Sequence, residues 1–508
     1  MINRNYISLL LLGTPIALFA CTVGLALGSA TTDGRPIVFK NRDITDWRLE
    51  FRVDTPSGEH AYVRNSYRGS STAWMGANEV GFAIVQSAAY NVSTSGGSGL
   101  GNGTMMNYAL KNCTTVDDFE DILIATNGGG RNTAANYAVI DAYGNGAIFE
   151  CSPHIYDRYD PDSLGIVVRA NFSYIGDYRR VGQNRMERAY DLMAEAIAGD
   201  SLDALYILKS VVSDLLFPDQ DPYPLPWTGS FPGMPAGYVN TGPFMGLQTT
   251  CNYNTLATGV VQGALVDGNP ENTLMWCSFG QPVLSIPIPV FPAAHDEPSQ
   301  LTGTTYTPAP MCSLAHAKSD SAFDHSTEYY LNTGFLLNEY YTGAHEYIIP
   351  TMEWAFDSVN TVLAEWESSP PSTAERSAFQ DGIAAIIYDA YSDGVPMTVV
   401  HSDFAGVPEK LEISAYPNPF NSVLTIEKPS GAEIAILDLN GRVVAVPSEI
   451  SHSKMVWRPG EETPSGVYFV RVKDSGRSVS HRVLPVSYTH LRAHETVLDL
   501  VCRLLLEK

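Results

Sequence analysis

The chain has 508 residues and little charge, and the charge that it has is strongly unbalanced. Charged residues make up only 17%, and 31 Lys and Arg stand against 55 Asp and Glu, so the formal net charge is -24. Proteins that bind nucleic acid or anionic membranes use basic patches to neutralise phosphate groups. The scarcity of basic residues therefore argues against both as the main partner. The 44% of hydrophobic residues is typical of globular domains with a sizeable core.

Cysteine is also scarce, and its spacing does not resemble a zinc site. The seven cysteines are Cys21, Cys113, Cys151, Cys251, Cys277, Cys312 and Cys502. Export would permit disulfides, but spacing alone does not decide whether any of Cys251, Cys277 and Cys312 pair. The histidines show no pairing that indicates a Cys-His dyad. We therefore expect neither a metal nor a bound cofactor.

Long apolar runs are absent except for residues 7–20, which follow Arg4. This run is too short to span a bilayer comfortably and is typical of a secretory signal, so residues 1–20 are predicted to be a signal peptide. Leu18-Phe19-Ala20-Cys21 also partly resembles a lipobox. A surface lipoprotein without catalytic activity, lipidated at Cys21, is therefore an alternative.

Cys21 would become the first residue of the mature chain if the leader were removed. It would then carry both a thiol and a free α-amine. The reactive species is the thiolate, and a free cysteine, with a pKa of about 8.5, is mostly protonated at neutral pH. An α-amine with a pKa of about 7.7–8.0 can take that proton within the same residue. The position therefore predicts an N-terminal nucleophile.

The residues after Cys21 favour a hairpin. Two strand-like runs, Thr22–Leu27 and Pro36–Phe39, flank the turn signal Thr32-Asp33-Gly34. The second run leads into Lys40-Asn41-Arg42-Asp43, which would return to the chain terminus. In an ideal strand Lys40 and Arg42 share one face, and Asn41 and Asp43 share the other.

The middle of the chain mixes strands and helices. A Gly/Ser-rich segment at 93–104 is expected to be mobile, and residues 217–247 form a long irregular loop whose aromatic residues could build an apolar pocket. These aromatic residues are Tyr223, Trp227, Phe231, Tyr238 and Phe244. Helices are predicted over Thr115–Thr126, Gln183–Ala198, Met352–Ser368 and Thr373–Tyr391. Strands are predicted over Phe82–Val85, Asn136–Ile140, Ala147–Cys151 and Ile166–Arg169.

The composition changes near residue 396, and short alternating strands fill residues 411–486. They predict a small all-β sandwich of immunoglobulin-like type, joined by a linker at 395–410. Its strands are expected over Val423–Ile426, Glu433–Leu437, Arg442–Val446 and Val467–Val472. The basic segment 487–508 shares no pattern with what precedes it. It resembles translated adapter read-through, and we exclude it from the fold.

The region from Cys21 to about Gly394 resembles the secreted acyl-coenzyme A:6-aminopenicillanic-acid acyltransferase-like hydrolases. That group includes relatives of isopenicillin N-acyltransferase and carcinine hydrolase and belongs to the N-terminal-nucleophile hydrolases. The resemblance lies in Cys21-Thr22, Asp33-Gly34-Arg35-Pro36 with Lys40 to Asp43, Gly76-Ala77-Asn78-Glu79-Val80-Gly81, and Arg169-Ala170-Asn171. It implies an α+β protein with a four-layer αββα domain over 21–394 that cleaves or transfers at linear amide C–N bonds.

The resemblance also implies roles for single residues. Cys21 matches the nucleophile, Asp43 the acid that lies near the thiol and amine, and Asn171 the amide that donates to the oxyanion. Arg185 resembles the helix arginine that supports the site. Lys40 stands where related choloylglycine and penicillin V hydrolases have arginine.

Other positions near these motifs are assigned less specific roles. Arg42 takes a variable place in the motif, so the identity of the cation beside the thiol stays open. Gln86, Ser87 or a backbone N–H near Ala88 could supply the second oxyanion donor. Asn78 and Glu79 are interpreted as turn and supporting residues.

The region 411–486 resembles the C-terminal sorting domain of the type IX secretion system. The marks are Tyr416-Pro417-Asn418-Pro419-Phe420-Asn421, Leu439-Asn440-Gly441-Arg442 and Ser465-Gly466-Val467-Tyr468. This resemblance implies export across the outer membrane by the type IX machinery, with the domain serving as an address. The sequence therefore predicts a secreted or surface-located enzyme that acts on small N-acyl amides. A dipeptidase of the other cysteine-started family, which shares the Cys-Thr opening, is an alternative.

Overall fold

Two antiparallel sheets form the centre of the larger of two structural units. The computed structural model describes residues 20–216, 220–230, 236–240, 249–304, 306–324, 330–395 and, with short gaps, 414–485. The chain divides into its two units near residue 400. The predicted signal peptide, linker and C-terminal tail lie almost wholly outside the described residues.

The first sheet has six strands in the order β10-β1-β2-β12-β13-β14. Its strands are β1 Thr22–Ala26, β2 Ile37–Asp43, β10 Ile166–Arg169, β12 Thr255–Gln262, β13 Leu274–Phe279 and β14 Ile288–Val290. The second sheet has seven strands in sequence order. They are β3 Leu49–Asp54, β4 Tyr62–Tyr67, β5 Met75–Asn78, β6 Ala83–Ala88, β7 Ala135–Ile140, β8 Gly146–Cys151 and β9 Tyr156–Tyr159.

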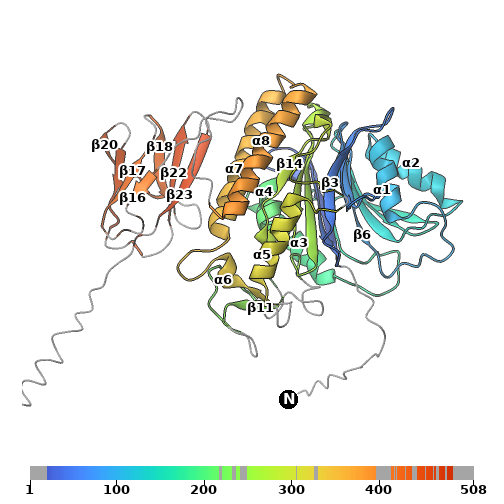
Figure 1. Cartoon of the computed structure of the whole chain (residues 1–508), viewed down its shortest axis with the longest axis horizontal. Coiled ribbons are helices and arrows are strands. Elements are labelled where there is room, and N and C mark those ends of the chain that lie inside the picture. The colour runs from blue at the N-terminus through green and yellow to red at the C-terminus, as the bar shows by residue number, and fades with distance from the viewer. Residues whose placement is uncertain are drawn as a thin grey trace, which may run out of the picture. The chain divides into compact units, whose positions relative to one another are not determined.

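The two sheets pack face to face, and helices cover both outer faces (Figure 1). Strands β1, β2 and β12 contact β5, β6 and β7 of the other sheet. Helices α3 Gln183–Ala198, α4 Ala204–Tyr206, α5 Pro310–Ala322, α7 His345–Trp366 and α8 Thr373–Asp393 lie on the side of the first sheet. Helices α1 Asn102–Asn112 and α2 Val116–Asn127 cover the second sheet. The predicted four-layer αββα fold is confirmed.

Most predicted elements form close to their expected bounds, but the helices α1, α4 and α5 and the strands β12, β13 and β14 of the first sheet were not predicted. Helix α1 begins inside the Gly/Ser-rich segment that was expected to be mobile. Its Met105, Met106 and Leu110 pack against the second sheet, and this tertiary burial outweighs the weak helix propensity of its glycine and asparagine residues. Helix α7 begins at His345, earlier than predicted, and continues through Pro350.

The cysteines of the described residues form no disulfide. Cys251, Cys277 and Cys312, for which pairing was left open, are buried free thiols, as are Cys113 and Cys151. Burial raises the pKa of the Cys113 and Cys151 thiols to about 12. These thiols therefore belong to the core and are poor nucleophiles.

The segment 217–247, predicted as an irregular loop throughout, contains a short strand, which pairs with a strand far along the chain. Strand β11 Tyr238–Asn240 pairs with β15 Tyr330–Asn332, and α6 Thr333–Leu336 comes directly after β15. None of the helices in the described part of the chain is long and apolar enough to cross a membrane.

The second unit consists of two four-stranded antiparallel sheets that share one hydrophobic core. The sheets have the orders β16-β17-β21-β20 and β19-β18-β22-β23. The predicted small all-β sandwich is thereby confirmed. Its strands are β16 Ser414–Tyr416, β17 Leu424–Glu427, β18 Glu433–Leu437, β19 Val443–Ala445, β20 Ser448–Ser451, β21 Lys454–Trp457, β22 Tyr468–Asp474 and β23 Arg477–Val483.

Candidate active site

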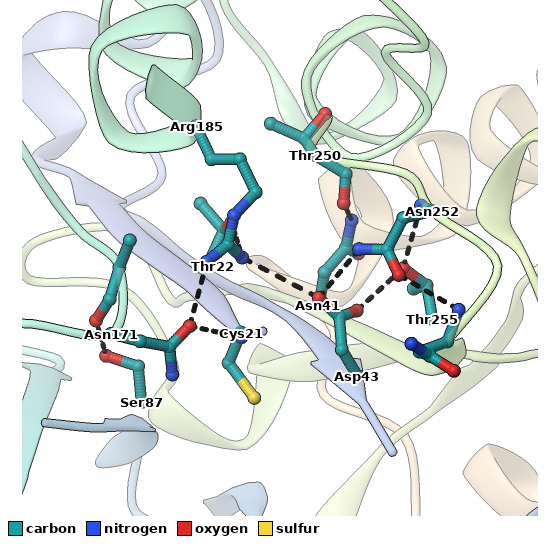
Figure 2. A network of polar contacts seen from close by, with 12 residues as sticks. Cys21, Thr22, Asn41, Asp43, Ser87, Asn171, Arg185, Thr250, Asn252 and Thr255 are labelled. Atoms are coloured by element: carbon teal, nitrogen blue, oxygen red, sulfur yellow. Dashed lines mark hydrogen bonds and ion pairs between the residues drawn. The ribbon is translucent and has the colours of Figure 1, made fainter. Parts of the chain in front are cut away.

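The backbone nitrogen of Cys21 is held by the side chain of Asn171. Val23 of β1 pairs with Arg169 of β10, so the antiparallel register brings Cys21 alongside Asn171. The Cys21 nitrogen donates to Asn171 Oδ1 at 2.7 Å (Figure 2). Asn171 Nδ2 donates to the carbonyl of Ala88 at 3.0 Å. These two bonds fix the amide so that its oxygen faces Cys21.

The thiol of Cys21 shares a sheet face with both predicted cations. Thr22 pairs with Asn41 of β2, so Cys21 lies opposite Arg42. Side chains alternate along a strand, and Lys40 and Arg42 therefore project from the same face as Cys21. The face of Thr22 carries Asn41 and Asp43 instead.

Lys40 and Arg42 are buried between the sheets, where aromatic rings and carbonyl oxygens contact them. Lys40 Nζ donates to the carbonyl of Trp74 at 3.1 Å, and Arg42 donates to Asn65 Oδ1 at 2.6 Å. The Arg42 guanidinium also lies 4.4 Å from the ring centre of Tyr67 and 5.1 Å from that of Trp74. Burial lowers the pKa of Lys40 to about 8 and that of Arg42 to about 10. Both remain cationic at neutral pH.

Asp43 lies on the opposite face and is fully buried. Its carboxylate accepts hydrogen bonds from Thr255 Oγ1 at 2.6 Å and from Asn252 Nδ2 at 2.8 Å. Arg185 Nη1 lies 3.6 Å from Asp43 Oδ2, the same oxygen that accepts from Asn252. Burial raises the pKa of Asp43 to about 6, and the Arg185 charge opposes that rise. Asp43 is therefore ionised at neutral pH but titrates far closer to neutrality than an exposed aspartate.

Arg185, on α3, connects the two sides of the site. It donates to Thr22 Oγ1 at 3.2 Å and to Asn171 Oδ1 at 2.8 Å (Figure 2). Its side chain is fully buried, and burial lowers its pKa. Asn171 Oδ1 thus accepts hydrogen bonds from both the Cys21 nitrogen and Arg185. Arg185 and Asn171 connect the Asp43 carboxylate to the Cys21 nitrogen, whereas the sequence predicted that Asp43 itself lies near the thiol and amine.

A glycine allows Arg185 to approach in this way. Gly182 precedes α3 with a φ of 80°, which favours glycine. A Cβ atom there would lie 2.1 Å from the guanidinium of Arg185. Any larger residue at 182 would displace the arginine.

The two remaining candidates of β6 differ in position. Ser87 Oγ donates its hydroxyl proton to the carbonyl of Ala170 at 2.5 Å, next to Asn171. That proton is therefore not available to an oxyanion. Gln86 projects from the other face of β6, on which Ile84 packs towards α1. The structure therefore brings Ser87 to the site in a supporting position and does not bring Gln86 there.

Asn78 and Glu79 lie away from the thiol. Asn78 donates to the carbonyls of Leu110 and Cys113, and Glu79 pairs with His295 at 2.6 Å. Both contacts are consistent with the turn and supporting roles expected for them.

Several residues of the site were not singled out from the sequence. Asn252 and Thr255 stand 209 and 212 positions after Asp43, and only the pairing of β12 with β2 brings them to its carboxylate. Asn136 reaches the site from the second sheet. No local pattern marks any of these residues, because their role depends on tertiary contacts.

A pocket of about 440 Å³ lies beside Asn171. Two of its lining residues contact Asn171 directly: Ala88 through its carbonyl, and Tyr90 through its N–H, which donates to the Asn171 carbonyl at 3.0 Å. Of the aromatic residues of 217–247, the three that the structure describes, Tyr223, Trp227 and Tyr238, do not line it. Tyr223 instead contacts Leu215 N, and Phe231 and Phe244 lie outside the described residues. The full lining is Trp74, Ala88, Ala89, Tyr90, Val92, Thr94, Gly101, Asn102, Asn132 and Ala134.

The raised pKa of Asp43 predicts opposite effects of acid on stability and on activity. Between an unfolded pKa of 3.8 and a folded pKa of about 6, the folded chain binds the proton and the unfolded chain does not. As the pH falls from 7 to 4, this group should add up to about 3 kcal/mol to the free energy of unfolding. Protonation also removes the anion that anchors Arg185, so turnover should fall below about pH 6.

Denaturant titrations of wild type and Asp43→Asn at several pH values isolate this contribution from those of the other carboxylates. The difference in unfolding free energy between the two proteins should change with pH in the stated direction. A difference that stays constant from pH 7 to pH 4 would contradict the assignment.

The second, smaller unit matches a known protein family. Residues 414–485 match the secretion system C-terminal sorting domain. The smaller unit is a sorting domain of this kind. The prediction made for it is confirmed, and it indicates export by type IX secretion to the cell surface or the medium. A comparison with curated protein sequences gives no match.

Solved structures similar to the chain include three hydrolases. A conjugated bile acid hydrolase variant from Clostridium perfringens is 15% identical, with 51% of this chain and 89% of that chain covered and a TM-score of 0.33. A penicillin V acylase from Agrobacterium tumefaciens is 15% identical, with 53% and 86% covered and a TM-score of 0.34. A Caenorhabditis elegans ortholog of N-acylethanolamine-hydrolyzing acid amidase is 13% identical, with 48% and 92% covered and a TM-score of 0.33. Similarities at this level do not assign an activity to the chain, so function is inferred from the site.

Proposed function

We propose that residues 21–394 form an exported cysteine amidohydrolase or acyltransferase that acts on linear amide bonds of N-acyl substrates. Removal of residues 1–20 would free Cys21 as the nucleophile. The contact that carries the proposal is the 2.7 Å hydrogen bond from the Cys21 nitrogen to Asn171 Oδ1. It holds in a fixed orientation the one atom that must become the proton acceptor.

The first step is transfer of the thiol proton to the α-amine of the same residue. Asn171 Oδ1 accepts an N–H of that amine, which leaves the nitrogen lone pair for the proton. Lys40 and Arg42 lie on the face of the thiol and favour the thiolate by charge. The sulfur then attacks the substrate carbonyl, and the carbonyl π electrons move to its oxygen.

The tetrahedral intermediate places a negative charge on that oxygen. Asn171 Nδ2 donates one N–H to Ala88 and carries a second, which is the proposed donor to the oxyanion. The ammonium of Cys21 returns its proton to the leaving nitrogen as the C–N bond breaks, and a thioester remains. Water or an acceptor amine resolves the thioester with the α-amine as base. The pocket beside Asn171 is the proposed site for one side of the amide.

The mass of the exported protein tests the starting point of this scheme. The mature chain should begin at Cys21 with a free amine, and it should release amine from members of an N-acyl amide library. Dipeptides in the same assay distinguish the dipeptidase alternative. An active protein whose Cys21 amine is lipidated or otherwise blocked would refute the scheme, because the proton acceptor would then be missing.

A further inference from the structure

Asn136 lies at the centre of a buried polar network that surrounds the backbone of Asn171. Its Nδ2 donates to the carbonyls of Ala170 and Phe172, both at 3.0 Å, and to Ser87 Oγ at 3.1 Å. Its Oδ1 accepts from Ser173 Oγ at 2.5 Å. Asn136 is fully buried and comes from β7 of the second sheet, whereas Asn171 follows β10 of the first. The side chain therefore bridges the two sheets at the site.

The contacted carbonyls flank Asn171 on both sides. Strand β10 ends at Arg169, so residues 170–173 have left the regular ladder of the first sheet. Buried carbonyls need donors, and here side chains of the second sheet supply them. An amide is the neutral side chain that offers two N–H donors and an accepting oxygen together. Neither Asp nor Ser could make this set of contacts.

We propose that Asn136 is a positioning residue for the reaction, which holds Asn171 Oδ1 against the Cys21 nitrogen by fixing the carbonyls before and after Asn171. This inference rests on the proposed function. Within the described residues, the Asn136 side chain forms hydrogen bonds to neither Cys21 nor a residue that lines the pocket, so it acts through Asn171. Loss of the hydrogen bonds from Asn136 to these carbonyls would let Asn171 shift, and the Cys21 amine would lose its fixed orientation.

Asn78 provides a matched control on the same sheet. It is also fully buried, donates to two carbonyls, those of Leu110 and Cys113 at 2.9 Å each, and accepts from Phe82 N. Asn78→Asp and Asn136→Asp therefore remove the same number of carbonyl contacts. Only the second change lies next to Asn171.

The experiment measures alkylation of Cys21 by iodoacetamide across pH in the mature protein, with the modified residue located by peptide mass and the melting temperature recorded for each variant. Both Asp variants should melt at lower temperature. Asn136→Asp should also slow Cys21 alkylation at neutral pH by about tenfold to about 100-fold, because small displacements at a reacting centre have effects of that size. Asn78→Asp should leave the alkylation rate and its pH profile unchanged.

A folded Asn136→Asp protein with the wild-type alkylation profile would overturn the inference, as would equal slowing by Asn78→Asp. If Asn136→Asp does not fold, Ser173→Ala replaces it, since it removes only the hydroxyl that orients the Asn136 amide. It should slow alkylation severalfold, and an unchanged rate overturns the inference. A wild-type protein whose Cys21 reacts no faster than its buried thiols would instead refute the proposed function itself.

Discussion

Cys21→Ala is expected to abolish amide cleavage, with a loss of about 10⁴-fold or more, because both the attacking atom and the covalent intermediate disappear. The fold should survive. Cys21 precedes β1, and its backbone nitrogen still donates to Asn171 in the variant. The measurement is initial rate on whichever library amide the wild type cleaves fastest, with the melting temperature as a check of folding.

Cys113→Ala is the matched control for this experiment. Cys113 is also a buried free thiol, but burial raises its pKa to about 12 and it packs beneath α1 and α2. Its replacement should cost some stability and leave turnover of the folded protein intact. Residual activity of Cys21→Ala within tenfold of the wild type would exclude a thioester route.

Arg185→Met should give the second largest effect, on stability and activity together. The variant keeps much of the side-chain volume but leaves Asp43 buried without its cation. Breaking a buried ion pair on one side typically costs about 3–5 kcal/mol. Asn171 Oδ1 and Thr22 Oγ1 also lose their donor, so turnover per folded molecule should fall by about 100-fold.

The double variant Arg185→Met/Asp43→Asn separates the two losses. It removes the unpaired carboxylate of Asp43 and should recover much of the stability. Turnover should stay low, because Asn171 Oδ1 still lacks the hydrogen bond from Arg185. Arg376→Met is a suitable control, since Arg376 is equally buried and contacts Asn272 and Glu271 away from the site. Turnover of folded Arg185→Met at the wild-type level would contradict the role given to this arginine.

The sequence predicted the parts of the fold that depend on local pattern. Helix α3 and strand β10 form at their expected bounds, because the amphipathic period of the helix and the short apolar run of the strand are visible in a single segment. Helix α1 was missed because glycine and asparagine at its start indicate a loop. Only the second sheet beneath Met105 and Leu110 makes the helix favourable.

The candidate site likewise has features that local strand geometry predicts and features that depend on tertiary contacts. The alternation of Lys40 and Arg42 against Asn41 and Asp43 followed from strand geometry alone. Which of these faces would hold the thiol could not be predicted, because it depends on the register of β1 against β2. The partners of Asp43 and the bridge made by Asn136 depend on pairings between segments far apart in the chain, and no spacing in the sequence encodes them.

The register of β1 has a consequence for any attempt to redesign or transplant this hairpin. Successive residues of a strand alternate sides, so a slip of one position between Thr22 and Asn41 would invert the first strand. The sulfur would then emerge among Asn41 and Asp43, beneath the helices, and the hydroxyl of Thr22 would occupy its former location. The length of the connection between the two strands is therefore as strict a requirement for a working terminus as the identity of the cysteine.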